Sequence, residues 1–536
     1  MFVIKYSLEG KLKLFKFLVN IRLDWSGILD NKIYELLKTY FGYDSFRSGQ
    51  EEIIDNILRK RDCMSVMPTG AGKSLCYQIP AVYFSGITLV ISPLISLMKD
   101  QVYDLNQIGI RAAYINSSLN ERQVEKALIN AKNSVYKIIY VAPERLNTAR
   151  FLNFASKAQI SFIAIDEAHC VSQWGHDFRR SYLRIPEFMG KLIKRPVIAA
   201  FTATATDSIK KDIIDKLKLD NPFMITTGFD RKNLYFSVFK PLDKTTFILK
   251  YIFKNLDKCG IIYCGTRAKV DDLTKILKIK GINAERYHAG LSDEERNKNQ
   301  DDFIFDRIKV MVATNAFGMG IDKSNVSYVI NYNMPMNIEQ YYQEAGRAGR
   351  DGRKADCILL YSKSDVNLCK FLLNSKIENA TDCTEEDRER LRELEEEKLK
   401  MMTFYSTTKY CLRHFILKYF GEKSRYNCNN CGNCDSIRYE DIIGLAPVPS
   451  QIKSVNKKDI DYDLLRKFKE KRLSIAKTQS VPAYVIFSDA VLEEMASLKP
   501  KTLRAMRDIN GIGKLKLEKY GQIFLDIIFN HEDLFD

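Results

Sequence analysis

A short glycine-rich segment carries residue types that suit phosphate binding. Gly70-Ala71-Gly72-Lys73-Ser74 follows a strand-like run at residues 63–66, and helix-like residues come after it. Glycines let backbone N–H groups approach phosphate oxygens, and the start of a helix adds partial positive charge. We expect Lys73 to reach the β- and γ-phosphates of a nucleotide and Ser74 to ligate Mg²⁺. A glycine-rich turn without a ligand is the alternative, because no earlier glycine completes the strict eight-residue pattern. The predicted nucleotide contacts here are Thr69, Gly70, Gly72, Lys73 and Ser74.

Two adjacent carboxylates end an apolar run further along the chain. Ile163-Ala164-Ile165 leads into Asp166 and Glu167, which Ala168 and His169 follow. At the end of a strand, Asp166 can hold Mg²⁺ through water and Glu167 can polarise the attacking water. A chance surface pair is the alternative, and the apolar strand before it argues against that reading.

Two arginines lie three residues apart in the segment Gln340 to Arg350. On a helix, Arg347 and Arg350 would share one face. Hydrolysis of a γ-phosphate builds negative charge on its oxygens, and an arginine delivered from another domain can stabilise that charge. We expect Arg350 to play this role with Arg347 beside it. A salt-bridged surface helix is the alternative.

Cys411, Cys428, Cys431 and Cys434 follow the spacing C-x16-C-x2-C-x2-C. Four thiolates at this spacing suit a tetrahedral structural Zn²⁺, and free thiols are the alternative. The other cysteines are scattered and are expected to be inert core residues.

The segment Cys170 to Arg179 places aromatic residues among polar ones. Trp174 and Phe178 offer flat faces on which nucleic-acid bases can stack, at ~1–3 kcal/mol per base. Arg179 offers a contact to a phosphate or a carboxylate. The alternative is that Trp174 belongs to the core.

The elements that must position these residues alternate between short apolar runs and helical segments. Strand-like runs occur near residues 87–91, 138–141, 162–165 and 197–201, and the pattern restarts after Gly228 with runs at 259–263, 310–313 and 329–330. Strands that alternate with helices indicate parallel sheets covered by helices on both faces. The sequence therefore predicts two successive α/β domains.

Composition narrows the class of protein. The chain has 536 residues, 83 Lys and Arg against 67 Asp and Glu, a net charge of +16 and a pI near 9.1, which favours nucleic acid or an anionic membrane as partner. Twelve cysteines are too few for a disulfide scaffold. The uncharged stretch from Ser74 to Met98 contains Pro80, Gly86 and Pro93, so we do not expect it to span a membrane.

Taken together, these motifs resemble those of superfamily 2 helicases, and the closest match is the RecQ family over about residues 30–536. Residues 41–50 resemble the RecQ adenine-recognition motif, which implies that Tyr43, Arg47 and Gln50 contact adenine. Residues 92–101, 201–206 and 313–323 resemble further helicase motifs. The loop that contains Trp174 resembles the aromatic-rich loop that links single-strand contact to hydrolysis in RecQ helicases.

The resemblance implies an α/β fold with two tandem RecA-like parallel-sheet domains, followed by a small helical zinc-binding module and an all-α HRDC-like domain. The C-terminal turn Gly511-Ile512-Gly513 could present N–H groups to phosphate, with contacts from Lys501, Arg504, Lys514 and Lys516. Only residues 435–457 separate the last cysteine from the helical C-terminus, so the winged-helix domain of many RecQ proteins is expected to be missing. The expected boundaries are 1–29 for an N-terminal extension, 30–227 and 228–372 for the two RecA-like domains, 373–437 for the zinc module, 438–457 for a linker and 458–536 for the HRDC-like domain.

The function implied by the resemblance is that of an ATP-dependent 3′ to 5′ DNA helicase acting in recombination and repair, with ATP, Mg²⁺ and Zn²⁺ as cofactors. Its expected partners are single-stranded and tailed duplex DNA and a single-strand-binding protein, without a membrane, and the expected state is a cytoplasmic monomer, associated with the nucleoid if the source is bacterial. One alternative is a DNA-stimulated ATPase that translocates without separating strands. An RNA helicase and a binding module with an inactive ATPase are further alternatives.

Overall fold

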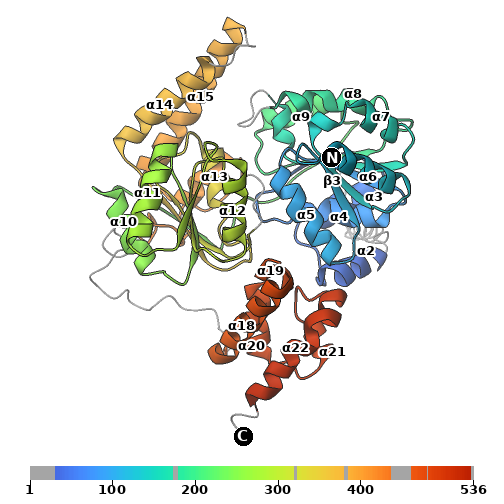
Figure 1. The fold of residues 1–536 in the computed structure, drawn as a ribbon. Helices are drawn as coiled ribbons and strands as arrows, with labels where there is room; N and C mark the ends of the chain where they lie inside the picture. Colours follow the sequence, from blue (N-terminus) through green and yellow to red (C-terminus); the bar gives the residue numbers. More distant parts are fainter. Residues whose placement is uncertain are drawn as a thin grey trace, which may run out of the picture.

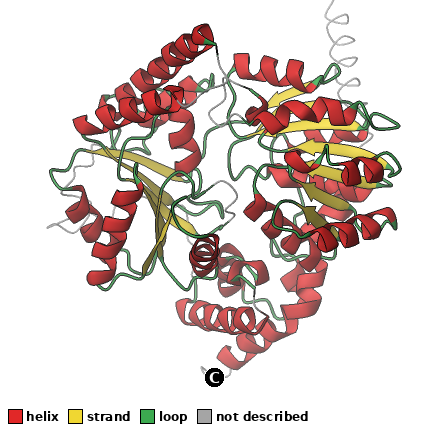
Figure 2. Cartoon of the chain, turned by 45° about the horizontal axis from the view of Figure 1, so that its top comes forward, coloured by secondary structure: helices red, strands yellow, loops and turns green. Residues whose placement is uncertain are grey.

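The computed structural model describes residues 31–172, 179–318, 323–378, 384–435, 460–479 and 481–532. Two α/β domains lie side by side, and a helical C-terminal domain lies beneath both of them in the view of Figure 1. Helices cover the faces of both sheets (Figure 2). The N-terminal extension lies outside the described residues.

The first domain contains a seven-stranded parallel sheet in the order β3-β4-β2-β5-β6-β1-β7. Strands β1, β2, β4 and β6 are buried along their whole length, as expected for a parallel sheet covered on both faces. The strands are β1 (Cys63–Val66), β2 (Ile87–Ile91), β3 (Ala112–Ile115), β4 (Ile138–Val141), β5 (Ile160–Ile165), β6 (Val197–Thr202) and β7 (Phe223–Thr226). The helices are α2 (Asn31–Leu36), η1 (Leu37–Phe41), α3 (Gln50–Leu58), α4 (Lys73–Tyr83), α5 (Ile95–Gln107), α6 (Glu121–Lys132), η2 (Pro143–Arg145), α7 (Ala149–Ala155), η3 (Ala168–Val171), η4 (Arg180–Arg184), α8 (Ile185–Met189) and α9 (Asp207–Leu217).

The second domain contains a six-stranded parallel sheet in the order β10-β11-β9-β12-β13-β8. Its strands are β8 (Leu234–Phe239), β9 (Cys259–Tyr263), β10 (Ala284–Tyr287), β11 (Val310–Ala313), β12 (Val326–Asn331) and β13 (Ala355–Leu360). Its helices are α10 (Lys244–Phe253), α11 (Arg267–Ile279), α12 (Asp293–Ile304) and α13 (Ile338–Ala345).

The expected α/β class with two parallel sheets is confirmed, and each strand-like run forms a strand. Five strands escaped the sequence analysis, namely β3, β7, β8, β10 and β13. Four of them are the edge strands of the two sheets. An edge strand is covered less completely, so its sequence carries a weaker apolar signal, as in β7 with alternating half-buried and exposed residues.

A helical hairpin and a small cysteine-bearing module follow the second sheet. The hairpin consists of α14 (Lys363–Glu378) and α15 (Glu385–Thr407), and it projects from the second domain in Figure 1. Helix α16 (Leu412–Tyr419) begins directly after Cys411. An isolated bridge between Phe236 of β8 and Cys431 ties the module to the second sheet.

The C-terminal domain has its own apolar core and contacts both α/β domains. Its helices are α18 (Tyr462–Gln479), α19 (Ala483–Ile486), α20 (Asp489–Leu498), α21 (Leu503–Arg507) and α22 (Lys514–Glu532). Gly511 N donates to Gly42 O at 3.0 Å in the first domain, and Arg353 Nη2 lies 2.9 Å from Asp489 across the second contact. No helix among the described residues is both long and apolar enough to cross a membrane.

Candidate active site

The glycine-rich loop joins β1 to α4, as the sequence predicted. Gly70 and Gly72 have φ of +81° and +83°, the left-handed region that favours glycine. A Cβ on Gly72 would lie 2.5 Å from Gln50 Nε2. The intervening Ala71 does not occupy this region, so an alanine is tolerated there.

The three residues expected to contact adenine lie beside this loop. Arg47 Nη1 donates to Gly70 O at 2.7 Å, and Gln50 Nε2 donates to Ala71 O and Gly72 O at 3.2 and 3.1 Å. Tyr43 is 41% exposed and, with Arg47 and Gln50, lines a cavity of about 410 Å³. Arg47 and Gln50 therefore fix the loop backbone, and Tyr43 presents its ring to the cavity.

The carboxylate pair lies at the end of β5 and faces the glycine-rich loop. Lys73 Nζ lies 3.5 Å from Glu167 Oε1. Burial raises the pKa of Asp166 to about 6, an effect that the Lys73 ammonium opposes and the Glu167 carboxylate reinforces. Glu167 has φ of +47°, which is uncommon for a residue with a side chain and is typical of strained functional positions.

His169 links the carboxylates to the end of β6. Its Nδ1 lies 2.9 Å from Thr202 Oγ1 and 3.3 Å from Glu167 Oε2, and Thr202 Oγ1 donates to Thr204 O at 3.1 Å. No role of His169, Thr202 or Thr204 is predicted from the sequence. The available signal was that two neighbouring strands end in polar residues at the same edge of the sheet.

The expectation that Arg347 and Arg350 share a helix face is wrong, because α13 ends at Ala345 and both residues lie in the turns that follow. The next residue, Gly346, approaches the first domain so closely that a Cβ on it would lie 2.1 Å from Thr69 Oγ1. The two guanidinium groups nevertheless reach the same cleft. Arg347 is buried, with 8% of its surface exposed.

This cleft lies between the two α/β domains and has a volume of about 250 Å³. The first domain contributes the loop and the two carboxylates, and the second contributes the two arginines. The predicted residues that line it are Thr69, Gly70, Gly72, Lys73, Ser74, Asp166, Glu167, Arg347 and Arg350. The cleft and the larger cavity share Gly72 and Ser74, so together they can hold a phosphate chain and an attached base.

The C-terminal domain closes one side of the larger cavity. Tyr484, Val485 and Lys516 line it together with the residues of the first domain. The turn expected to bind phosphate packs instead on the first domain, where a Cβ on Gly42 would lie 2.5 Å from Gly513 N. In this arrangement neither the turn nor Lys516 faces outward to a nucleic acid.

Of the aromatic-rich segment, Trp174 and Phe178 lie outside the described residues. Arg179 is described, and its Nη1 donates to Pro93 O at 3.1 Å, just before α5. Its backbone N–H donates to Cys170 O at 2.9 Å. Arg179 thus ties the end of this segment to the motif at residues 92–101.

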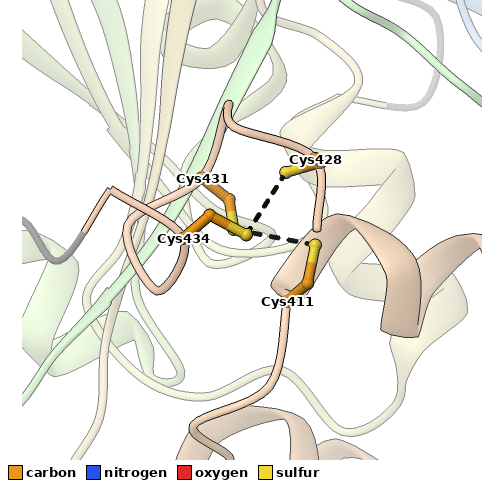
Figure 3. A group of neighbouring side chains, drawn as sticks. All are labelled: Cys411, Cys428, Cys431 and Cys434. Atoms are coloured by element: carbon orange, nitrogen blue, oxygen red, sulfur yellow. Dashed lines mark hydrogen bonds between the residues drawn. The ribbon is translucent and has the colours of Figure 1, made fainter. Parts of the chain in front are cut away.

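The four predicted zinc ligands come together, and their side chains point toward one another in Figure 3. All four Sγ atoms lie within 4.8 Å of one another, and the Cys428–Cys434 and Cys411–Cys431 separations are 3.9 Å. A tetrahedron with Zn–S bonds of about 2.3 Å places its sulfurs about 3.8 Å apart. The cluster therefore fits one structural Zn²⁺.

The cysteine module also contacts the segment that joins the two α/β domains. Arg413 of α16 lies 2.6 Å from Asp230 Oδ1 and also donates to Leu234 O. The ring of Phe229 stacks on Phe420 with centroids 4.4 Å apart. This role is not predicted from the sequence, because nothing in the spacing of these residues pairs them.

Family comparisons match the chain in four successive stretches. The DEAD/DEAH box helicase model matches residues 47–212 and the helicase conserved C-terminal domain model residues 243–352. The RecQ zinc-binding model matches residues 363–435 and the HRDC domain model residues 461–528.

Full-length relatives agree with these matches. The ATP-dependent DNA helicase RecQ of Bacillus subtilis is 37% identical, over 93% of this chain and 98% of the relative. The protein of the same name from Pasteurella multocida is 34% identical, over 93% and 94%. The structure of S. cerevisiae Dbp5 bound to RNA and ADP BeF3 is 21% identical, with a TM-score of 0.51 over 69% of this chain and 96% of that one, a likeness of fold.

The alignment with the Bacillus protein is longer than this chain. It runs over 591 residues, whereas 93% of the 536 residues here, about 498, take part, so about 93 residues of the relative lie opposite gaps. That is the size of a small domain. Only residues 436–460 separate the zinc-binding and HRDC matches, which supports the expectation that no winged-helix domain stands between them.

Proposed function

Because the chain belongs to the RecQ family of ATP-dependent DNA helicases, we propose that it uses ATP hydrolysis to move 3′ to 5′ along one DNA strand and to separate duplexes that carry a 3′ tail. The observation that carries this proposal is the cleft in which Lys73 and Glu167 of the first domain face Arg350 of the second. A site divided between two domains can open and close once per nucleotide, which is what stepping along a strand requires.

The first domain binds and orients the nucleotide in this proposal. Lys73 reaches the β- and γ-phosphates, and the backbone N–H groups of the loop surround them. Ser74 and Asp166 would hold Mg²⁺, which neutralises phosphate charge when bound. Tyr43 packs against the adenine, while Arg47 and Gln50 hold the loop in place.

Hydrolysis then depends on one carboxylate and two arginines. Glu167 orients the attacking water, and His169 Nδ1 lies 3.3 Å from Oε2 of that carboxylate. Arg350 stabilises the charge that builds on the γ-phosphate oxygens, and the buried Arg347 supports it from the same side. Neither arginine can act unless the two domains are closed, so hydrolysis is tied to domain closure.

Single-stranded DNA crosses both α/β domains in this proposal, with Trp174 and Phe178 stacking on bases and Arg179 linking that segment to residues 92–101. The net charge of +16 supports binding through phosphates, which weakens steeply as salt rises. We further propose a zinc-bearing monomer that acts in recombination and repair, associates with the nucleoid in a bacterial cytoplasm and works with a single-strand-binding protein.

The test is unwinding of a 3′-tailed duplex, with ATPase activity measured on the same sample. We expect unwinding with a 3′ tail and not with a 5′ tail, and loss of both activities in Glu167→Ala, which should retain nucleotide binding. Equal stimulation of the ATPase by RNA and DNA, or unwinding only from a 5′ tail, would contradict the proposal.

The short stretch between the zinc-binding and HRDC matches, where we expect no winged-helix domain, favours a second candidate, a DNA-stimulated translocase that does not separate strands by itself. In many relatives that domain contacts the duplex. DNA-stimulated ATPase activity without unwinding of either tailed duplex would support this candidate.

A further inference from the structure

Arg231 stands out among the half-buried polar residues that the proposed reaction leaves unused. It lies between β7 and β8, in the segment that joins the two α/β domains. Its Nη1 donates to Thr69 O at 3.2 Å and to Gly346 O at 2.8 Å. Its Nη2 donates to Ala348 O at 2.9 Å and to Gly349 O at 2.6 Å. One guanidinium group therefore joins four backbone carbonyls.

Three of these carbonyls belong to the turns that carry Arg347 and Arg350. They follow the end of α13, where carbonyl groups have no partner within the helix and the helix dipole places partial negative charge. A guanidinium group suits this position, because its rigid fork of donors forms charge-assisted hydrogen bonds in several directions at once. Arg231 thus fixes the backbone on both sides of Arg347 and directly before Arg350.

The fourth carbonyl belongs to the other domain, at the start of the glycine-rich loop. A Cβ on Gly70 would lie 3.1 Å from Arg231 Nη1 and 3.7 Å from Arg350 Cγ. The loop backbone is therefore packed against both arginine side chains. Arg231 spans the boundary between the domains at the point where Arg350 must meet the phosphates.

Arg231 does not itself reach the reacting groups. It is absent from the described residues that line the cleft and the larger cavity. Its own carbonyl accepts a hydrogen bond of 2.9 Å from Arg413 Nη1, so the zinc module fixes its backbone from the opposite side.

We propose that Arg231 is a positioning residue that sets the placement of Arg347 and Arg350 against the glycine-rich loop when the two domains are closed. The proposal rests on the proposed function, because it assumes that Arg350 stabilises the transition state. Opening of the domains would break the bond to Thr69 O and keep the three bonds to the turns, so the two arginines would move with Arg231 as one unit.

The test compares Arg231→Ala and Arg231→Lys with the control Lys232→Ala in the full-length protein. Lys232 is the exposed neighbour on the same segment. Misplacement of a catalytic group by about 1 Å can cost ~10²-fold in rate, so we expect Arg231→Ala to lower the DNA-stimulated kcat about 10- to 100-fold. The KM for ATP should change less than about threefold, because the groups that bind ground-state phosphates remain in place. Arg231→Lys, which keeps the charge without the fork, should fall between Arg231→Ala and the wild type.

A double-mutant cycle with Arg350→Ala separates positioning from general damage. If Arg231 acts through Arg350, adding Arg231→Ala to Arg350→Ala should change kcat by less than about twofold. Effects that multiply would overturn the proposal, as would an Arg231→Ala or Arg231→Lys protein with the kcat of the wild type. Thermal unfolding of each variant verifies folding, and Arg231→Lys carries the test alone if Arg231→Ala does not fold.

The same experiment distinguishes a failure of the role proposed for Arg350 from a failure of the role proposed for Arg231. A fully active Arg350→Ala protein would overturn the role of Arg350 in the proposed function. An inactive Arg350→Ala protein beside a fully active Arg231→Ala protein would overturn the role of Arg231 alone.

Discussion

Charged side chains at the cleft contact specific partners on neighbouring elements of the first domain. Lys73 pairs with Glu167, and His169 lies between Glu167 and Thr202. Buried charged and polar groups are costly unless they are paired, so each contact also keeps its neighbour in one geometry. That geometry places the Glu167 carboxylate, the His169 imidazole and the Lys73 ammonium within one small volume, where charged groups can position phosphates and water.

Glu344 is a buried carboxyl group in this region, and its pKa lies near neutral pH. It lies in α13, three residues before Arg347, and it accepts hydrogen bonds from Gln340 and Asn331 at 2.9 and 2.5 Å. Burial raises its pKa from 4.5 to about 7, although both hydrogen bonds and the Arg347 guanidinium favour the ionised form.

We predict that Glu344→Gln changes how stability depends on pH. The folded protein keeps a proton on Glu344 between pH 4.5 and 7 that the unfolded chain has released. The contribution of this group to the free energy of unfolding therefore falls as pH rises through that window. From pH 5 to pH 7.5, the Tm of the wild type should fall by about 2–5 °C relative to that of Glu344→Gln. The exposed Glu385→Gln is the control, and parallel Tm profiles for wild type and Glu344→Gln would refute the prediction.

The segment between the two α/β domains is positioned by elements on both sides. Arg231 binds the turns after α13, while α16 holds the same segment through Arg413 and the stacked Phe229–Phe420 pair. Tyr342 of α13 adds a third contact, because its hydroxyl donates to Phe229 O at 2.7 Å. The cysteine module thus acts on the interdomain segment as well as on its own fold.

We predict that loss of Zn²⁺ weakens the contacts between the cysteine module and the interdomain segment. Without the metal, the thiolates repel one another and the module loses its main source of folding free energy. Chelation should release one zinc ion per chain, lower the first Tm by at least roughly 5 °C, and reduce DNA-stimulated kcat more than the affinity for ATP. Addition of Zn²⁺ should restore both. A chelated protein that has lost its zinc and keeps the Tm and kcat of the untreated sample would rule this out.

At the scale of the whole molecule, the C-terminal domain bridges the two α/β domains. It binds the first through the turn at Gly511–Gly513 and the second through ion pairs from Arg353 to Asp489 and Glu493 at 2.9 and 3.3 Å. Burial disfavours the charge on Asp489, but the Arg472 and Arg353 guanidinium groups hold the pKa of this carboxyl at about 2. The bridge lies beside the cavity that holds Tyr43, so its position and nucleotide access are linked.

We predict that Arg353→Glu releases the C-terminal domain from the second α/β domain. Two partly exposed ion pairs contribute up to about 1 kcal/mol each, so their loss and the new repulsion should shift docking at least roughly tenfold. Small-angle X-ray scattering should show a larger radius of gyration, and high salt should act on the wild type in the same direction. Arg466→Glu is the control, because within the described residues Arg466 forms its ion pairs with Asp463 and Glu470 of its own helix. An unchanged scattering curve for Arg353→Glu would show that the apolar contacts alone hold the domain.

The sequence by itself determined all but one of the inner strands of the two sheets, and it determined the chemistry of the site. Buried parallel strands such as Ile87–Ile91 are predominantly apolar, so they are visible without any tertiary information. Phosphate loops, strand-end carboxylates and clustered cysteines are likewise local patterns, because a few neighbouring residues supply the whole chemical requirement. The four cysteines come together as their spacing predicted.

Tertiary structure alone decided how these parts meet. Helix α13 ends at Ala345, and the next residue, Gly346, lies against Thr69 of the other domain, which is far away in the chain. Three sets of contacts join residues that lie far apart in the chain. They are the four hydrogen bonds of Arg231, the contacts of Arg413 with the interdomain segment and the packing of Gly513 on Gly42. A hydrogen bond to a backbone carbonyl constrains no partner side chain, so the sequence carries no record of it until the fold brings the two groups together.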